Sequence, residues 1–116
     1  MRNFSVRFHS TRAVEVLDLV GELDAHTVAE LEAAFQKCQQ DGNHQIVVNG
    51  ARLRYISSAG QGVFMGYIDE IREQGGDIKI AALTPHVFNV FDLLGFPLLF
   101  NIVDTEEEAI ALFGIT

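Results

Sequence analysis

Cysteine, proline and tryptophan are nearly missing from this sequence of 116 residues, which has one cysteine, two prolines and no tryptophan. A single cysteine, Cys38, excludes an internal disulfide framework and a cysteine-based zinc site. The hydrophobic fraction is 48%, so the composition is that of a folded chain rather than a disordered or collagen-like one. The length predicts a single domain spanning residues 1–116.

Positive charge is also scarce, because 8 Lys and Arg residues stand against 16 Asp and Glu residues, for a formal net charge of -8. This balance excludes the basic footprint of a nucleic-acid-binding protein and a polybasic membrane anchor. No apolar run approaches the roughly 18 residues that a membrane-spanning helix needs, and polar residues interrupt Met1–Arg7, where a signal peptide would begin. We expect a cytoplasmic protein without a direct nucleic-acid or membrane partner.

Hydrophobic periodicity predicts secondary-structure elements in the order β-β-α-β-α-β-α-β-α. Strands are expected at residues 4–8, 13–20, 46–48, 78–83 and 100–103, the first two as an antiparallel hairpin and the third leaving the sheet at Asn49-Gly50. Helices are expected after Asp24, from Ser58, after Thr84-Pro85 and after Thr105, ending at Gly42, Gly75, Gly95 and Gly114. Asp24, Thr84 and Thr105 are the expected N-caps of the first, third and fourth of these helices. This order predicts an α/β fold: a mixed sheet whose later strands are mostly parallel, with about four helices.

The residues that enzymes use for chemistry are not arranged for it in this sequence. His9, His26, His44 and His86 fall on different predicted elements without the spacing of a metal site. No serine lies in a G-x-S-x-G turn, and Gly60-Gln61-Gly62 lacks the third glycine of a dinucleotide-binding loop. The sequence predicts a protein that is not an enzyme and needs no cofactor.

The segment Tyr55–Val63 stands out because it places two hydroxyl groups, those of Ser57 and Ser58, between a strand and a helix. The small residues that follow are expected to leave the backbone sterically open. A helix N-terminus has unpaired N–H groups and a partial positive charge, so a phosphate ester on a side chain is favourable there. The alternative is that one of the two serines is an ordinary N-cap and that the small residues only allow close packing.

Five segments carry a resemblance that covers nearly the whole chain without large gaps. They are Gly21–Asp24, Ile46–Asn49, Tyr55–Val63, Gly75-Gly76 and Phe91–Phe96. Together they resemble the STAS-domain anti-sigma factor antagonists, in particular the stand-alone sporulation-type form. The resemblance implies the STAS fold and a partner switch. In that switch the unmodified antagonist binds an anti-sigma factor that is also a serine kinase, and so frees the sigma factor. Phosphorylation of one serine from ATP ends the binding, and a metal-dependent phosphatase reverses it.

The same resemblance assigns roles to residues of this chain. Ser58 falls on the phosphoacceptor position, with Ser57 in reserve. Partner contact is expected from Asp24, Ser57, Ser58, Ala59, Gly60, Gln61 and Gly62. Two of these depart from the pattern: Ser57 stands where the sporulation protein has an aspartate, and Gln61 stands where leucine is usual. The second departure is expected to put a polar group on the docking surface.

Other functions stay open on the sequence alone. A STAS scaffold subunit of a signalling or transport assembly would bind its partner stably and never be phosphorylated. A small-ligand or nucleotide sensor would use the loop Gly60-Gln61-Gly62. The opening strand could also pair two copies if it is exposed, so we expect a monomer or a weak homodimer.

Overall fold

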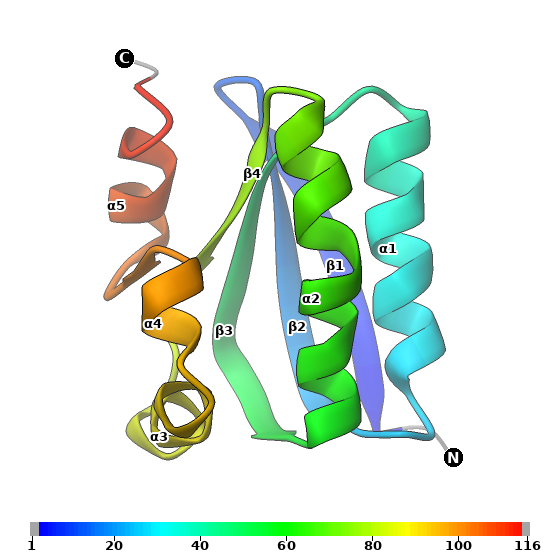
Figure 1. Ribbon diagram of the computed structural model, residues 1–116, viewed down its shortest axis with the longest axis vertical. Coiled ribbons are helices and arrows are strands. Elements are labelled where there is room, and N and C mark those ends of the chain that lie inside the picture. The colour runs from blue at the N-terminus through cyan, green and yellow to red at the C-terminus, as the bar shows by residue number, and fades with distance from the viewer. Residues whose placement is uncertain (1–2, 115–116) are drawn as a thin grey trace.

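The computed structural model describes residues 3–114, which form a five-stranded sheet flanked by helices (Figure 1). The strands are β1 (Phe4–Thr11), β2 (Val14–Leu23), β3 (Gln45–Ile56), β4 (Asp77–Ala81) and β5 (Ile102–Val103). The helices are α1 (Val28–Gln40), α2 (Ser58–Glu73), α3 (Pro85–Leu93), α4 (Phe96–Leu99) and α5 (Glu106–Ala111). The predicted α/β fold is confirmed, with the short helix α4 as an addition to the four that were expected.

The sheet is mixed, as predicted. The strands follow one another across it in chain order, from β1 at one edge to β5 at the other. β1 and β2 form the antiparallel hairpin, and the pairs β2–β3, β3–β4 and β4–β5 are parallel. Because parallel strands end at the same edge of a sheet, the segments that leave β2 and β3 lie next to each other at the lower end of Figure 1.

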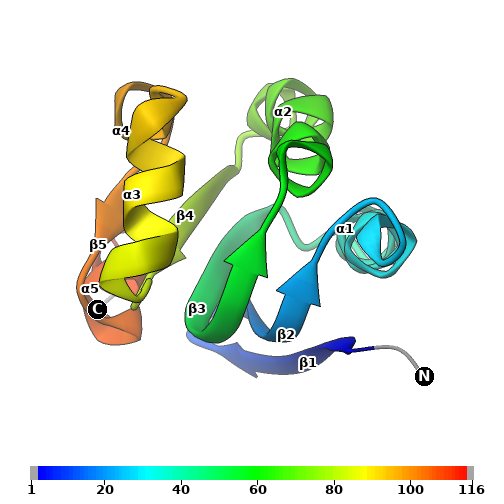
Figure 2. The same ribbon diagram turned by 90° about the horizontal axis from the view of Figure 1, so that it is seen from below.

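Helices cover both faces of the sheet (Figure 2). The larger core lies between the sheet and helices α1 to α4, and it is centred on Phe64, which is fully buried. The Phe64 ring meets four other aromatic rings edge-on at centroid distances of 5.7 to 6.1 Å, those of Phe35, Phe91, Phe96 and Phe100. A smaller core lies under α5 on the opposite face, where Ala109 and Ile110 pack on residues of β2, β3 and β4.

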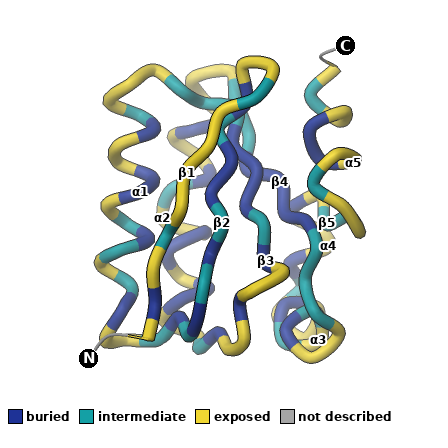
Figure 3. The backbone as a smooth tube through the Cα atoms, turned by 180° about the vertical axis from the view of Figure 1, so that it is seen from behind, coloured by how far each residue is buried: buried dark blue, intermediate teal, exposed yellow. Residues whose placement is uncertain are grey.

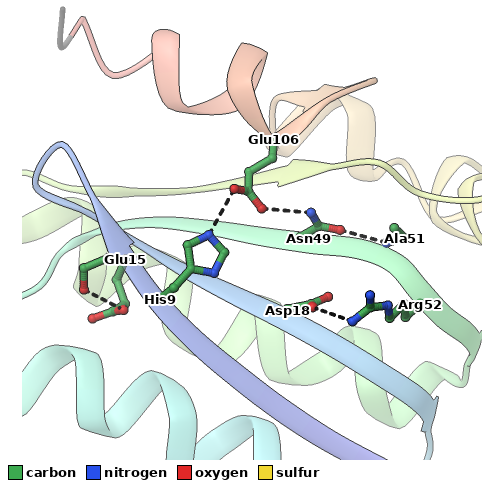
Figure 4. A network of polar contacts seen from close by, with 8 residues as sticks. His9, Glu15, Asp18, Asn49, Ala51, Arg52 and Glu106 are labelled. Carbon is green, nitrogen blue, oxygen red and sulfur yellow. Dashed lines mark hydrogen bonds and ion pairs between the residues drawn. The ribbon is translucent and has the colours of Figure 1, made fainter.

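The central strand β3 is much longer than the predicted residues 46–48. Asn49-Gly50 is not the exit of the strand but the position of a β-bulge, where β3 has one more residue than β2 between successive pairs. The side-chain oxygen of Asn49 accepts a hydrogen bond from the backbone N–H of Ala51 at 2.9 Å. Its amide nitrogen donates to Glu106 of α5 at 2.9 Å (Figure 4). The strand therefore continues along β2 as far as Ile56, which carries the chain to the start of α2.

Most of the predicted helix ends are confirmed. Thr84 and Thr105 cap α3 and α5, accepting backbone N–H groups at 3.4 and 3.1 Å. Gly42 and Gly95 both have φ of 76°, the left-handed conformation that ends a helix. The last strand is shorter than expected because the backbone N–H of Phe100 donates back to Phe96 and closes α4. Among residues 3–114, no helix is long and apolar enough to cross a membrane.

Candidate functional site

The candidate site lies where β2 and β3 end side by side. Leu23 pairs with Ile56, and the backbone N–H of Ser57 donates to the carbonyl oxygen of Leu23 at 2.9 Å. This bond joins the turn that begins with Asp24 to the segment that opens α2. The structure thus brings together the two segments in which the sequence placed its candidate residues.

The two serines of the site differ in what their hydroxyl groups do. Ser57 is the N-cap of α2, and its Oγ accepts a hydrogen bond from the backbone N–H of Gly60 at 3.3 Å. Ser58 is the first residue of the helix and is exposed, and its hydroxyl makes no hydrogen bond within residues 3–114. The N-cap alternative therefore holds for Ser57, while Ser58 presents a hydroxyl group to solvent at a helix N-terminus.

Gly60 and Gln61 face the interior, contrary to the expectation that this loop is sterically open and polar at its surface. A Cβ atom on Gly60 would lie 2.8 Å from Cγ of Leu23 and 3.0 Å from Cγ1 of Ile56. The Gln61 side chain is only 3% exposed. The expectation of a polar Gln61 group on the docking surface is wrong, because the helical turn directs residue 61 inward. Its Oε1 is buried without a hydrogen-bond partner in the described structure.

A continuous exposed face of α2 begins at Ser58. Its members follow at the spacing of helical turns and are all exposed: Ser58, Ala59, Gly62, Met65 and Gly66. A Cβ atom on Gly62 or Gly66 would meet nothing within 4 Å. We call this set the α2 face. Its side chains are small except for that of Met65, which is 45% exposed, so the backbone of another protein can approach this face closely.

Asp24 does not cap α1, contrary to prediction. The N-cap residue is Thr27, without a side-chain cap bond. Asp24 instead shapes the turn before the helix: its Oδ1 accepts from the backbone N–H of His26 at 2.8 Å, and its own N–H donates to Oγ1 of Thr27 at 2.9 Å. The helix begins later than predicted because Asp24 to Thr27 form this hydrogen-bonded turn first. Asp24 is half-buried and directly follows Leu23, whose carbonyl oxygen accepts the backbone N–H of Ser57.

The positive charges that precede the site along the chain lie near the end of β3. Arg52 and Arg54 are exposed, as is Tyr55, which keeps 47% of its surface open. Arg52 lies 3.5 Å from Asp18 on β2 (Figure 4), so part of its charge is already paired. The first turn of α2 holds no acidic residue, which leaves its N-terminal dipole uncompensated from within the helix.

The described residues hold no cluster of three or more His, Cys, Asp or Glu side chains that could bind a metal ion. His9 lies on β1, His26 in the turn before α1, His44 just before β3 and His86 on α3. His9 contacts Glu106 of α5 at 3.1 Å (Figure 4). The geometry at Ser58 is that of an exposed hydroxyl on a helix terminus beside a small-residue surface.

The STAS domain model matches residues 6–109 of this sequence. The chain belongs to the STAS domain family. An anti-sigma-B factor antagonist of Staphylococcus epidermidis is 31% identical over 87 residues, covering 75% of this chain and 81% of that protein. The anti-sigma factor antagonist SpoIIAA in its unphosphorylated form is 30% identical, with a TM-score of 0.81 over 97% of this chain and 99% of that one. The phosphorylated form of Bacillus SpoIIAA matches with a TM-score of 0.70 at 30% identity, over 95% and 98% of the two chains.

These matches place this STAS domain among the anti-sigma factor antagonists of the SpoIIAA type, which are regulators rather than enzymes. The sequence predicted contact residues around Ser58, but two members of the α2 face, Met65 and Gly66, lie outside that predicted set. The signal was present, since both follow Ser58 at helical spacing. The stronger pattern in this helix is that of its buried side, where large apolar residues recur at Phe64, Ile68 and Ile71.

Proposed function

We propose that this protein is a phosphorylation-controlled partner switch, in which one STAS domain spanning residues 1–116 binds an anti-sigma factor through the α2 face. Binding frees the sigma factor, and phosphorylation of Ser58 ends the binding. One structural difference carries the proposal: Ser58 presents a free hydroxyl to solvent, whereas the neighbouring hydroxyl of Ser57 is engaged as the N-cap of α2.

The position of Ser58 explains how one phosphate would change binding without unfolding the domain. A phosphate there adds about -1.5 to -2 charges at pH 7. Within this chain the N-terminal end of α2 favours a negative group, so the fold tolerates it. On the α2 face the same group lies at one end of a surface of small residues. There it would be desolvated by a docked partner, which makes the complex unfavourable.

We also propose two partners and a cellular location for the switch. The anti-sigma factor is also the serine kinase that uses ATP on Ser58, and a metal-dependent phosphatase removes the phosphate. The proposed contact set is the α2 face together with Asp24, and it keeps Ser58, Ala59 and Gly62 from the contacts expected on the sequence. Gly60 and Gln61 are buried, so we propose that they support the contact set by packing the first turn of α2 against the sheet rather than by touching the partner. We place the switch in the cytoplasm, and ATP and metal belong to the partners rather than to this chain.

The test is site mapping by mass spectrometry on protein recovered from its own cells, with Ser58→Ala and Ser57→Ala as the matched pair. We expect one phosphate on Ser58, absent from Ser58→Ala and retained in Ser57→Ala. The purified anti-sigma factor should bind the unmodified protein and lose at least tenfold in affinity for Ser58→Asp. Phosphate on Ser57 alone would refute the assignment of the acceptor. Absence of phosphate under every growth condition, with the partner still bound, would refute the switch and leave a scaffold subunit.

A further inference from the structure

The outer edge of the sheet is open along β1, where the strand is mostly exposed (Figure 3). Its antiparallel register with β2 is unbroken. The backbone N–H of Glu22 donates to the carbonyl oxygen of Asn3 at 2.7 Å, which makes Asn3 and every second residue after it a bonding partner of β2. The residues in between direct their backbone N–H and C=O groups outward. These are Phe4, Val6, Phe8 and Ser10.

A groove of about 420 Å³ runs along this edge between β1 and α1. The groove residues are Ser5, Val6 and Phe8 on the strand and Glu30, Ala33, Ala34 and Lys37 on the helix. Phe8 keeps 41% of its surface exposed. A strand edge with free backbone groups and an exposed aromatic side chain is a template for pairing with another strand.

The charges on the helix side of the groove would complement those of a second copy of the same helix. Glu30 and Lys37 stand about one turn to either side of Ala33-Ala34. A two-fold axis through the middle of the groove would run two copies of α1 antiparallel, which directs each Glu30 carboxylate toward the Lys37 ammonium of the other copy. Lys37 also bonds to Asp41 at 2.7 Å, but this pair is exposed on both sides and contributes little to stability. The small alanines at the centre allow the two helices to approach.

The strand side is symmetric about the same point. With the axis at Val6, the outward backbone N–H and C=O groups of Val6 bond to those of Val6 in the second copy. Phe8 then lies opposite Phe4 of the second copy, on the face of the sheet that the helices cover. Arg7 then lies opposite Ser5, so this register opposes no like charges. On the other face of the sheet, the ring of His9 already contacts Glu106 (Figure 4).

We propose that this edge is a homodimer interface, in which β1 pairs antiparallel with β1 of a second copy about Val6 and continues the sheet across both. The second copy is favoured over a foreign strand because the charges of the groove complement each other under a two-fold axis. No groove residue belongs to α2, so the dimer and the switch proposed above fail or succeed separately.

The first test is the molar mass of the protein by light scattering or sedimentation over a range of concentrations. We expect the mass to rise from 12.8 kDa toward twice that value. Phe8→Lys places a charge at the edge and should return the protein to a monomer, with an unchanged circular dichroism spectrum. Tyr55→Lys is the matched control, because it alters an equally exposed aromatic residue elsewhere and should leave the dimer intact.

The second test uses one introduced cysteine per variant, since the native Cys38 is buried. Val6→Cys lies on the proposed axis, where paired Cα atoms are about 5.5 Å apart, within the range of a disulfide. Ser10→Cys lies on the same edge but about 27 Å from its own copy, at about 3.4 Å per residue. Mild oxidation should therefore cross-link Val6→Cys and leave Ser10→Cys as a monomer on a denaturing gel.

The charges of the groove give a third readout. Glu30→Lys and Lys37→Glu should each weaken the dimer tenfold or more, because each opposes like charges twice, and the double variant should recover most of the loss. Three results would overturn the proposal. The first is a molar mass that stays at 12.8 kDa up to a protein concentration of about 1 mM, which is far above the Kd of a specific interface. The others are a dimer that Phe8→Lys leaves intact, and cross-linking of Ser10→Cys in preference to Val6→Cys.

Discussion

Two glycines in the first turns of α2 should respond oppositely to the same change. At Gly60, a Cβ atom would lie 2.8 Å from Cγ of Leu23 and 3.0 Å from Cγ1 of Ile56, and both side chains are buried. Overpacking of this kind costs about 1 to 3 kcal/mol. Replacing glycine by alanine in a helix gains at most about 1 kcal/mol. Gly60→Ala should therefore lower the free energy of unfolding by about 1 kcal/mol.

Gly62→Ala is the matched variant, two residues along the same helix, where a Cβ atom meets nothing within 4 Å. Only the helix-propensity gain remains, so this variant should be more stable than the parent by about 0.5 to 1 kcal/mol. Gly66→Ala, also open, should behave in the same way.

Urea unfolding followed by far-UV circular dichroism would measure the difference. With m values of about 1 to 3 kcal/mol/M, the midpoints of Gly60→Ala and Gly62→Ala should lie about 1 M apart. An equal or higher midpoint for Gly60→Ala would refute the packing of α2 against Leu23 and Ile56. A changed m value for one variant would mean that the midpoints cannot be compared directly, and thermal unfolding would then be used to compare the two variants.

Three further changes test the cap, the core and the buried thiol. Ser57→Ala should lower the free energy of unfolding by about 0.5 to 1 kcal/mol through loss of the N-cap, whereas Ser58→Ala should change it by less than about 0.5, both by urea unfolding. Phe64→Ala should cost about 3 to 5 kcal/mol, because it removes the ring that four others contact; a loss below about 1 would contradict that core. Burial, reinforced by Glu15, raises the pKa of Cys38 from 9.0 to about 12, so a thiol reagent should leave it unmodified at pH 8 until urea unfolds the chain. Because the unfolded thiol ionises first, the Cys38 contribution to stability should be full below pH 9 and be lost as pH rises toward 12, in a pH series of unfolding curves.

The candidate site shows how far local sequence carries the argument. Two adjacent serines before a helical pattern predict that one caps the helix, but a shift of one residue exchanges their roles. The choice follows from the register of β3 against β2, which pairs Ile56 with Leu23 and fixes Ser57 by a backbone bond to Leu23. The same register decides that Gly60 packs against those two side chains and that Gln61 turns inward.

The central strand shows why its length was underestimated. Asn49-Gly50 combines two residues that usually end a strand, and it lies in a β-bulge that keeps the strand going. What sustains the pairing is distant in sequence: β2 on one side, and Glu106 of α5 holding the Asn49 amide. Because β3 was predicted to end at Val48, the sequence did not predict that the start of α2 lies next to the end of β2.

The sequence by itself determined the α/β order, the hairpin, the caps at Thr84 and Thr105, the glycine stops and the family, because each depends on residues that are close along the chain or on a pattern spread over all of it. The tertiary structure alone decided which serine hydroxyl is free, which residues of α2 face solvent, and that β1 is an open edge facing a groove. These depend on strand register and on packing between segments far apart in the chain, and a shift of one residue there reverses which side chain is buried.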